Sequence, residues 1–208
     1  MNKFKSIRRN TVMAIGILIM GLGVSIFKFS LMGNDPSNAS YMAIAAKIGL
    51  SYAVTAWILN GLLFVIEIIF GRKMIGPGTF VNWLGVGVVS TFFTNLINQI
   101  FTAPDTFLMK LVIMAIGVLV LSFACSLYQT ADVGIAPYDA LSIILNEKTK
   151  IPYFWCRITT DAVCALVTWL LGGIVGLGTL VCALGLGPFI TMFDKLISRK
   201  IVNGRKEN

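Results

Sequence analysis

Arg157 and Asp161 are charged residues inside the apolar stretch 153–171. A charge near the centre of a bilayer costs roughly 2.5–3.5 kcal/mol on insertion scales, so such residues are candidates for binding an ion or a polar solute, or for carrying a proton. They lie four positions apart on one helical face and can form an ion pair. The pair either belongs to a solute pathway or only lowers the cost of insertion, and both interpretations stay open. Glu67, near the end of the stretch 52–70, is expected to reach the membrane surface instead.

Two similar loop-and-helix motifs, residues 33–39 and 134–140, carry most of the other polar candidates. In each motif a glycine permits a sharp turn and a proline can occupy the first position of a short helix, whose free N–H groups favour an anion. The motifs could line a polar cavity, or Asp35 and Asp139 could serve only their own helix ends. The predicted turn and helix-start residues are Gly33, Pro36, Gly134 and Pro137. The predicted pathway residues are Asn34, Asp35, Ser37, Asn38, Asn60, Asp139, Arg157 and Asp161.

Other kinds of chemistry find little support in the sequence. The chain has no histidine, and its four cysteines lie in apolar runs without the spacing of a zinc or redox site. A GxSxG nucleophile motif and a paired acid-base constellation are also missing from the sequence. We therefore expect no metal, no cofactor and no enzymatic activity.

The elements that must position these residues are membrane-spanning helices. Of the 208 residues, 57% are hydrophobic and 12% are charged, which is far more apolar than a soluble domain. Runs of about twenty apolar residues are long enough to cross a bilayer as helices. The sequence predicts an all-α integral membrane protein with one domain, 1–208, and two short helices at 36–47 and 137–148 that are re-entrant or interfacial. The six predicted spans are 11–30, 52–70, 79–101, 108–129, 153–171 and 178–195.

Lys and Arg residues predict the orientation, because they are retained on the cytoplasmic side. Most of the 17 fall on one side if both termini are inside. We therefore expect cytoplasmic tails, attraction to anionic lipid and no binding to nucleic acid, because no basic surface is interleaved with aromatic residues. The basic segments are the tail 1–10, the loop 71–78, the segment 131–151 and the tail 196–208 with the adjoining Lys195.

The second half of the chain repeats the first. Gly33 and Pro36 match Gly134 and Pro137, and the stretch 75–93 matches 175–193 with glycines and threonines in register. Repeat one covers about 11–101 and repeat two about 108–195. Each repeat has three spans, so the second copy must enter the membrane from the opposite side. Such inverted repeats occur in many secondary transporters, whose solute site lies near the midplane between them.

These residues also suggest a family. Both halves contain G-x-x-P-x-[DN]-A and G-x-G-T-x-V-x-x-L-G-x-G, and with the basic termini these motifs resemble the YczE/YyaS/YitT group of bacterial multipass membrane proteins. The resemblance covers nearly the whole chain and is most specific at 134–140 and 175–188. It implies a location in the bacterial plasma membrane and supplies no catalytic residues. The first copy has Asn38 and Asn60 where the second has Asp139 and Asp161, so we expect the second repeat to titrate.

Two functions fit these observations. The first is a secondary transporter that moves a small polar or ionic solute through a midplane site between the repeats, with coupling to protons through Asp139 or Asp161. The second is a membrane scaffold that assists another enzyme or regulator and uses its basic tails for docking. The expected partners are the lipid bilayer, an unidentified small solute and, as an option, a second copy of the chain in a homodimer.

Overall fold

A computed structural model describes residues 3–33, 35–173 and 175–203, and these residues form helices and connecting loops with no strand. The π-helix Asp194–Ser198 joins α8 to α9, and the short 3-10 helix Arg72–Met74 follows α3. The α-helices are α1 (Lys3–Phe29), α2 (Pro36–Ile48), α3 (Tyr52–Phe70), α4 (Pro77–Ile100), α5 (Phe107–Ala131), α6 (Pro137–Thr149), α7 (Tyr153–Leu170), α8 (Leu177–Phe193) and α9 (Arg199–Asn203).

Four helical segments of the described chain are long and apolar enough to cross a membrane: Ser6–Phe29, Pro77–Ile100, Phe107–Ala131 and Leu177–Asn203. A fifth apolar helix, Val54–Phe70, is shorter. Large apolar side chains such as Ile69 and Leu170 are exposed on the outside of the molecule, as expected for contact with lipid. The prediction of an all-α membrane protein is therefore confirmed, whereas the predicted number of six spans stays a prediction.

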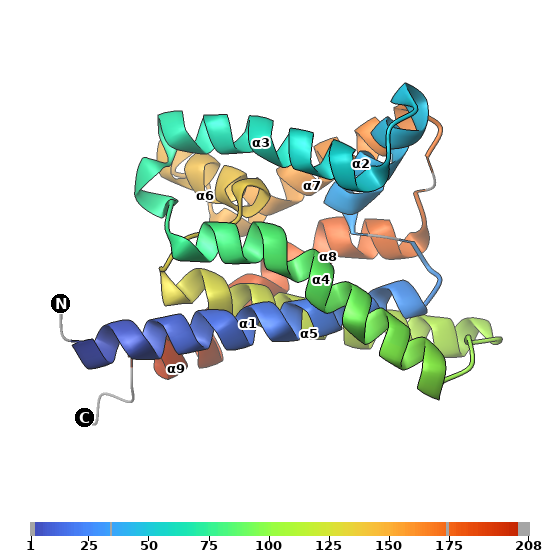
Figure 1. The fold of residues 1–208 in the computed structure, drawn as a ribbon, viewed down its shortest axis with the longest axis horizontal. Coiled ribbons are helices and arrows are strands. Elements are labelled where there is room, and N and C mark those ends of the chain that lie inside the picture. The colour runs from blue at the N-terminus through green and yellow to red at the C-terminus, as the bar shows by residue number, and fades with distance from the viewer. Residues whose placement is uncertain (1–2, 34, 174, 204–208) are drawn as a thin grey trace.

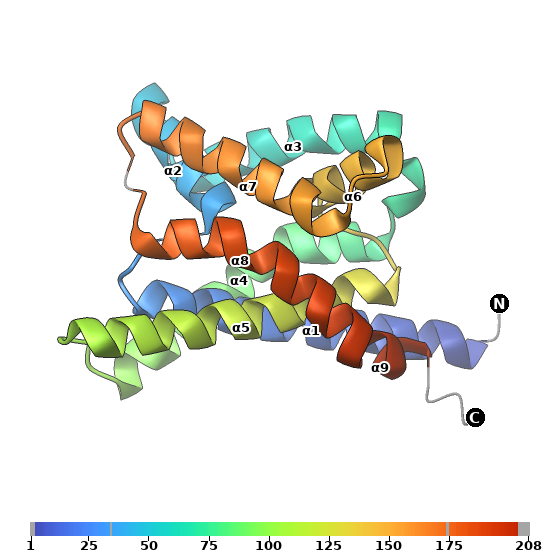
Figure 2. The same ribbon diagram turned by 180° about the vertical axis from the view of Figure 1, so that it is seen from behind.

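The long helices α1 and α5 make the most extensive helix–helix contact; they run in opposite directions along one edge of the molecule (Figure 1). Glycines allow this close approach, because a Cβ on Gly117 would lie 2.8 Å from the Phe27 backbone, and one on Gly16 would lie 3.0 Å from Tyr128. Helix α4 packs on α1 and α8 packs on α5. The remaining helices α2, α3, α6 and α7 form a second layer on one side of these four (Figures 1 and 2).

The two short helices begin as the sequence predicts. Pro36 and Pro137 are the first residues of α2 and α6, and Gly33 and Gly134 have φ values of 130° and 125°, a conformation that favours glycine. Each glycine loop packs against the start of a long helix from the other half of the chain. Gly78 donates a backbone hydrogen bond to Val133 (3.0 Å), and its counterpart Gly178 donates one to Met32 (2.9 Å). The repeated sequences thus make matching contacts.

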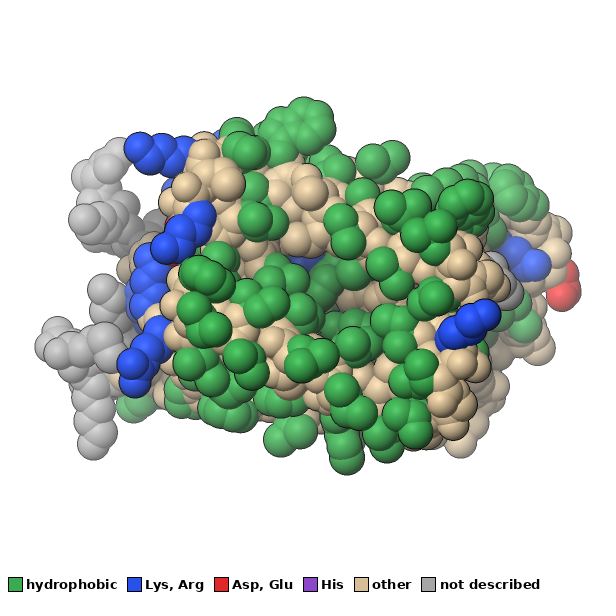
Figure 3. All heavy atoms as spheres, turned by 90° about the horizontal axis from the view of Figure 1, so that it is seen from above, with side chains coloured by type: hydrophobic (Ala, Val, Ile, Leu, Met, Phe, Trp, Pro, Cys, Tyr) green, Lys and Arg blue, Asp and Glu red, His purple; other side chains and the backbone are tan. Residues whose placement is uncertain are grey.

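Basic side chains gather at one end of the molecule, where the start of α1 and helix α9 also lie (Figures 1 and 3). We call this the basic end and define it by the described residues Arg72, Lys73, Lys148, Lys150 and Lys195 with their neighbours in the two tails. The sequence predicts such a gathering, because most Lys and Arg residues lie in segments that it places on one side of the membrane.

Candidate functional site

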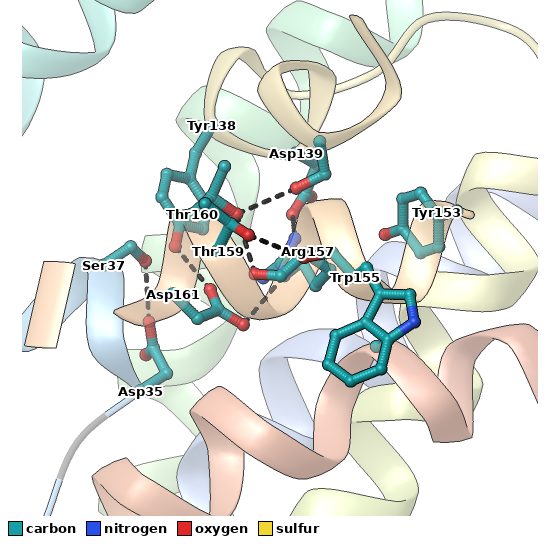
Figure 4. Close-up of polar contacts among 12 residues, drawn as sticks. Asp35, Ser37, Tyr138, Asp139, Tyr153, Trp155, Arg157, Thr159, Thr160 and Asp161 are labelled. Carbon is teal, nitrogen blue, oxygen red and sulfur yellow. Dashed lines mark hydrogen bonds and ion pairs between the residues drawn. The ribbon is translucent and has the colours of Figure 1, made fainter. Parts of the chain in front are cut away.

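Arg157 of α7 forms ion pairs with two aspartates (Figure 4). Its Nε donates a hydrogen bond to Asp161 Oδ2 at 3.1 Å, one helical turn along α7, and its Nη1 donates one to Asp139 Oδ1 at the start of α6. The predicted i,i+4 pair is confirmed. The contact with Asp139 joins the two groups of candidates that the sequence placed separately.

Two tyrosines complete this arrangement, which we call the Arg157 cluster (Tyr128, Tyr138, Asp139, Arg157 and Asp161). Tyr138 donates a hydrogen bond to Asp161 Oδ1, and Tyr128 of α5 donates one to Asp139 Oδ2. The guanidinium of Arg157 also lies 5.0 Å from the centre of the Tyr138 ring, within the range of a cation–π interaction. Sequence reasoning missed both tyrosines. The position of Tyr138 beside Asp139 was an available signal, whereas nothing in the sequence pointed to Tyr128.

The Arg157 cluster is buried and has more acidic than basic groups. Arg157 is 5% exposed, Asp139 is 7% exposed and Asp161 is fully buried. All four carboxylate oxygens of Asp139 and Asp161 accept a hydrogen bond, and buried charges need such partners to offset the loss of water. One guanidinium faces two carboxylates, so the cluster has a net negative charge when both are ionised. The arrangement can hold an ion or a proton, or it can orient a polar solute.

A cavity of about 660 Å³ lies beside the cluster. Among its lining are aromatic side chains, including Tyr41, Trp57 and Trp83, whose faces suit an organic solute. Asp161 is the fully buried member of the cluster and does not line the cavity, while Asn34 lies outside the described residues. The predicted pathway residues that do line it are Asp35, Ser37, Asn38, Asn60, Asp139 and Arg157.

Asp35 has both of the roles that the sequence left open, at a helix end and in a polar cavity. Its carboxylate accepts hydrogen bonds from the Asn38 backbone N–H (3.1 Å) and the Ser37 hydroxyl (2.7 Å), so it caps α2 (Figure 4). It also lines the cavity. Asn60 donates a hydrogen bond to the Ala56 carbonyl within its own helix (2.9 Å) and also lines the cavity.

The cavity opens between α3 and α4. The exposed side chains of Trp57 on α3 and of Leu84 and Val88 on α4 line it. Nothing lies within 4 Å of the position that a Cβ on Gly87 would take. Its counterpart Gly187 is buried, and there a Cβ would lie 2.8 Å from the Phe154 carbonyl oxygen. Helix α7 is thus closed on α8, whereas the matching pair of helices is open.

Side-chain size explains part of this difference. Phe64 of α3 contacts Phe80 and Trp83 of α4, with ring centroids 5.7 and 5.8 Å apart. The positions that match Phe64 and Trp83 in the second half, Ala165 and Ala183, are small and buried, so α7 lies directly along α8. The aromatic contact of Phe64 with Phe80 and Trp83 joins α3 to α4 near the basic end. Farther from the basic end, at Gly87, the two helices are apart.

A smaller cavity of about 260 Å³ lies at the basic end. Its lining residues Gln129 and Thr191 are the repeat counterparts of Lys28 and Thr91 in the large cavity. Tyr153 donates a hydrogen bond to Gln129 (3.2 Å) across this cavity. The two cavities therefore occupy related positions in the two repeats. The one in the first repeat is wide, with the larger volume, and the one in the second repeat is narrow.

One prediction from the sequence was wrong. Glu67 does not reach the membrane surface, because it is fully buried and neither carboxylate oxygen has a hydrogen-bond partner among the described residues. Lys73 pairs with Glu147 of α6 instead (2.8 Å). No three His, Cys, Asp or Glu side chains come together as metal ligands in the described part of the chain.

Comparison of the amino-acid sequence with known proteins places the chain in a family. Residues 7–195 match the family described as "Family of unknown function (DUF6198)". The chain belongs to the DUF6198 family. The relatives of this DUF6198 chain include the "Uncharacterized membrane protein YczE" of Bacillus subtilis (strain 168), which is 26% identical over 88% of this chain and 83% of its own length. They also include the "Uncharacterized protein YyaS" of the same organism, 25% identical over 91% of this chain and 94% of its own.

A third relative of the DUF6198 chain is an "Uncharacterized protein" of Haemophilus influenzae (strain ATCC 51907 / DSM 11121 / KW20 / Rd), 23% identical over 91% of this chain and 84% of its own. No solved structure matches the chain. Membership of the group that contains YczE and YyaS confirms the resemblance read from the sequence, and the name of YczE agrees with a membrane protein. Because the names of these relatives state no activity, the function is inferred from the Arg157 cluster and the cavity.

Proposed function

We propose that this protein is a secondary transporter of a small polar or ionic solute, with six spans arranged as two inverted repeats in the bacterial plasma membrane. Both termini and the basic end face the cytoplasm, following the positive-inside rule. The protein catalyses no covalent chemistry in this proposal. The solute binds in the large cavity, between the Arg157 cluster and the polar residues Asn60 and Asp35.

The observation that carries the proposal is the difference between Gly87 and Gly187. Gly187 has its neighbour in van der Waals contact, whereas the repeated glycine Gly87 faces open space. A transporter built from inverted repeats exchanges the conformations of its two halves, so the cavity that opens on one side closes when its counterpart opens. In this interpretation the described state is open to the outside, and closure of α3 on α4 would use the space that Gly87 leaves free.

The narrow cavity at the basic end supports the same interpretation. The hydrogen bond between Tyr153 and Gln129 joins two of its lining residues, and α7 and α8 are in contact through Phe154 and Gly187. In the alternate state these contacts would separate, and Thr191 would face the cytoplasm. The wide and narrow cavities then represent the same pathway entrance in its open and closed forms.

The experiment is labelling of single cysteines with a membrane-impermeant thiol reagent. Thr91→Cys should react in intact cells, and Thr191→Cys should react in inside-out vesicles, in each case above the background of the wild-type chain with its buried or half-buried cysteines. If both variants react from the same side of the membrane only, the two repeats are not inverted and the proposal is contradicted. Absence of reaction at Thr191→Cys under every condition, together with capture of a defined partner by the basic tails, would favour the membrane scaffold.

A further inference from the structure

Glu67 is a carboxylate that the proposed solute site does not use. It lies on α3, is fully buried, and has two oxygens without a hydrogen-bond partner among the described residues. An isolated carboxylate charge in such surroundings is so unfavourable that the group takes up a proton instead. A neutral carboxylic acid at this position removes the largest part of that cost.

The other buried carboxylates differ from Glu67 in their partners. Asp139 and Asp161 each accept one hydrogen bond from Arg157 and one from a tyrosine, and these contacts stabilise their ionised forms. The counterpart of Glu67 in the second repeat is Thr168, which hydrogen-bonds to the Cys164 carbonyl in its own helix (2.8 Å). The second repeat therefore has no ionisable group at the position of Glu67, and its fold forms without one.

The charged groups around Glu67 also favour a neutral acid. Asp139 of α6 is acidic, and a negative charge there opposes a second negative charge on Glu67. Lys148 of α6 lies over the Phe70 ring (5.8 Å), and Lys73 after α3 is paired with Glu147. Arg72 is exposed at the basic end, and Lys47 of α2 is exposed near the opposite end of that layer. None of these cations forms an ion pair with Glu67.

We propose that Glu67 is a buried proton-binding site, protonated at neutral pH, and that its proton is the one to which movement between the two states is coupled. The coupling rests on the proposed transport function, whereas the proton site does not. Because α3 must close on α4 in the alternate state, a group on α3 changes its surroundings in that step. Asp139 and Asp161 then stay hydrogen-bonded to Arg157 and fix the solute site.

The first experiment is infrared difference spectroscopy of the purified full chain in lipid nanodiscs. At neutral pH the wild type should show the C=O stretch of a protonated carboxylic acid, and Glu67→Gln should lose this band. Glu147→Gln, which removes an exposed glutamate instead, is the matched control and should retain the band. If the wild type and Glu67→Gln have the same spectrum in this region, the proton site is overturned.

The second experiment measures coupling through the labelling pair Thr91→Cys and Thr191→Cys. The ratio of their labelling should change with pH in the otherwise native chain, and this pH dependence should disappear when Glu67→Gln is added. The same pH dependence in Glu67→Gln would overturn the coupling. If Thr191→Cys never reacts, the transport proposal fails, while the infrared band still decides the protonation of Glu67.

Discussion

Gly187 of α8 lies against Phe154 of α7 so closely that a Cβ on the glycine would come within 2.8 Å of the Phe154 carbonyl oxygen. No side chain larger than hydrogen fits there without moving a helix, because the obstructing atom belongs to the backbone. The same glycine in the first repeat, Gly87, has no such neighbour. This pair of positions provides a matched test of packing against function.

Gly187→Leu should destabilise the protein by about 1–3 kcal/mol or more, because the new side chain overpacks the contact between α7 and α8. Gly87→Leu should leave stability nearly unchanged, since its Cβ would enter open space. Thermal unfolding of both variants in the same detergent measures the difference. Equal destabilisation of the two variants would show that α3 and α4 are closed in the predominant state.

Arg157→Gln should be strongly destabilising, by about 3–5 kcal/mol, because it leaves two buried carboxylates without their shared cation. Asp139→Asn and Asp161→Asn should each cost less, because one carboxylate still neutralises Arg157 and each amide can still accept a tyrosine hydrogen bond. Unfolding midpoints of the three single variants rank these effects. An Arg157→Gln variant as stable as either asparagine variant would mean that the cluster is not ionised as described.

Gly134→Ala should be more destabilising than Gly172→Ala, although both glycines have positive φ values. The backbone strain of a non-glycine residue costs about 1–3 kcal/mol at either position. At Gly134 a Cβ would also lie 2.7 Å from the Thr79 backbone nitrogen, whereas at Gly172 nothing lies within 4 Å. If the two alanine variants unfold at the same temperature, the glycine loop does not pack on α4.

A solute of the large cavity should raise the unfolding temperature of the purified protein. At a hundred times its dissociation constant, a ligand of the folded state stabilises by about 2.7 kcal/mol. A panel of metabolites and ions, with Asn60→Leu as the variant that removes a polar group of the lining, would detect it. We expect at least one compound to stabilise the wild type and to lose this effect in Asn60→Leu. If no compound in a broad panel shifts the wild type, a solute-binding role for the cavity is contradicted.

The sequence predicted the parts of this structure that depend on local chemistry. Pro36 and Pro137 begin their helices, Gly33 and Gly134 adopt positive φ values, and Arg157 pairs with Asp161 one turn away. Each of these follows from residues close together in the chain, or from the duplication that repeats them.

Contacts across the chain were harder to predict. The hydrogen bond from Tyr128 to Asp139 depends on how α5 meets α6, and a tyrosine in an apolar helix has no distinctive spacing. Glu67 was misplaced because a position near a helix end suggests exposure, whereas the packing of α3 against α6 buries it. The opening between α3 and α4 depends on the size of Phe64 and Trp83 relative to Ala165 and Ala183, which hydropathy does not register.

Alternation between two states is the central claim, and distances between spin labels measure it most directly. One pair, Trp57→Cys with Val88→Cys, spans the opening between α3 and α4, and a second pair, Trp155→Cys with Leu184→Cys, reports on α7 and α8. Across pH values and added solutes, we predict that the first distance shortens whenever the second lengthens. A single unchanging distance for both pairs under all of these conditions would contradict alternating access.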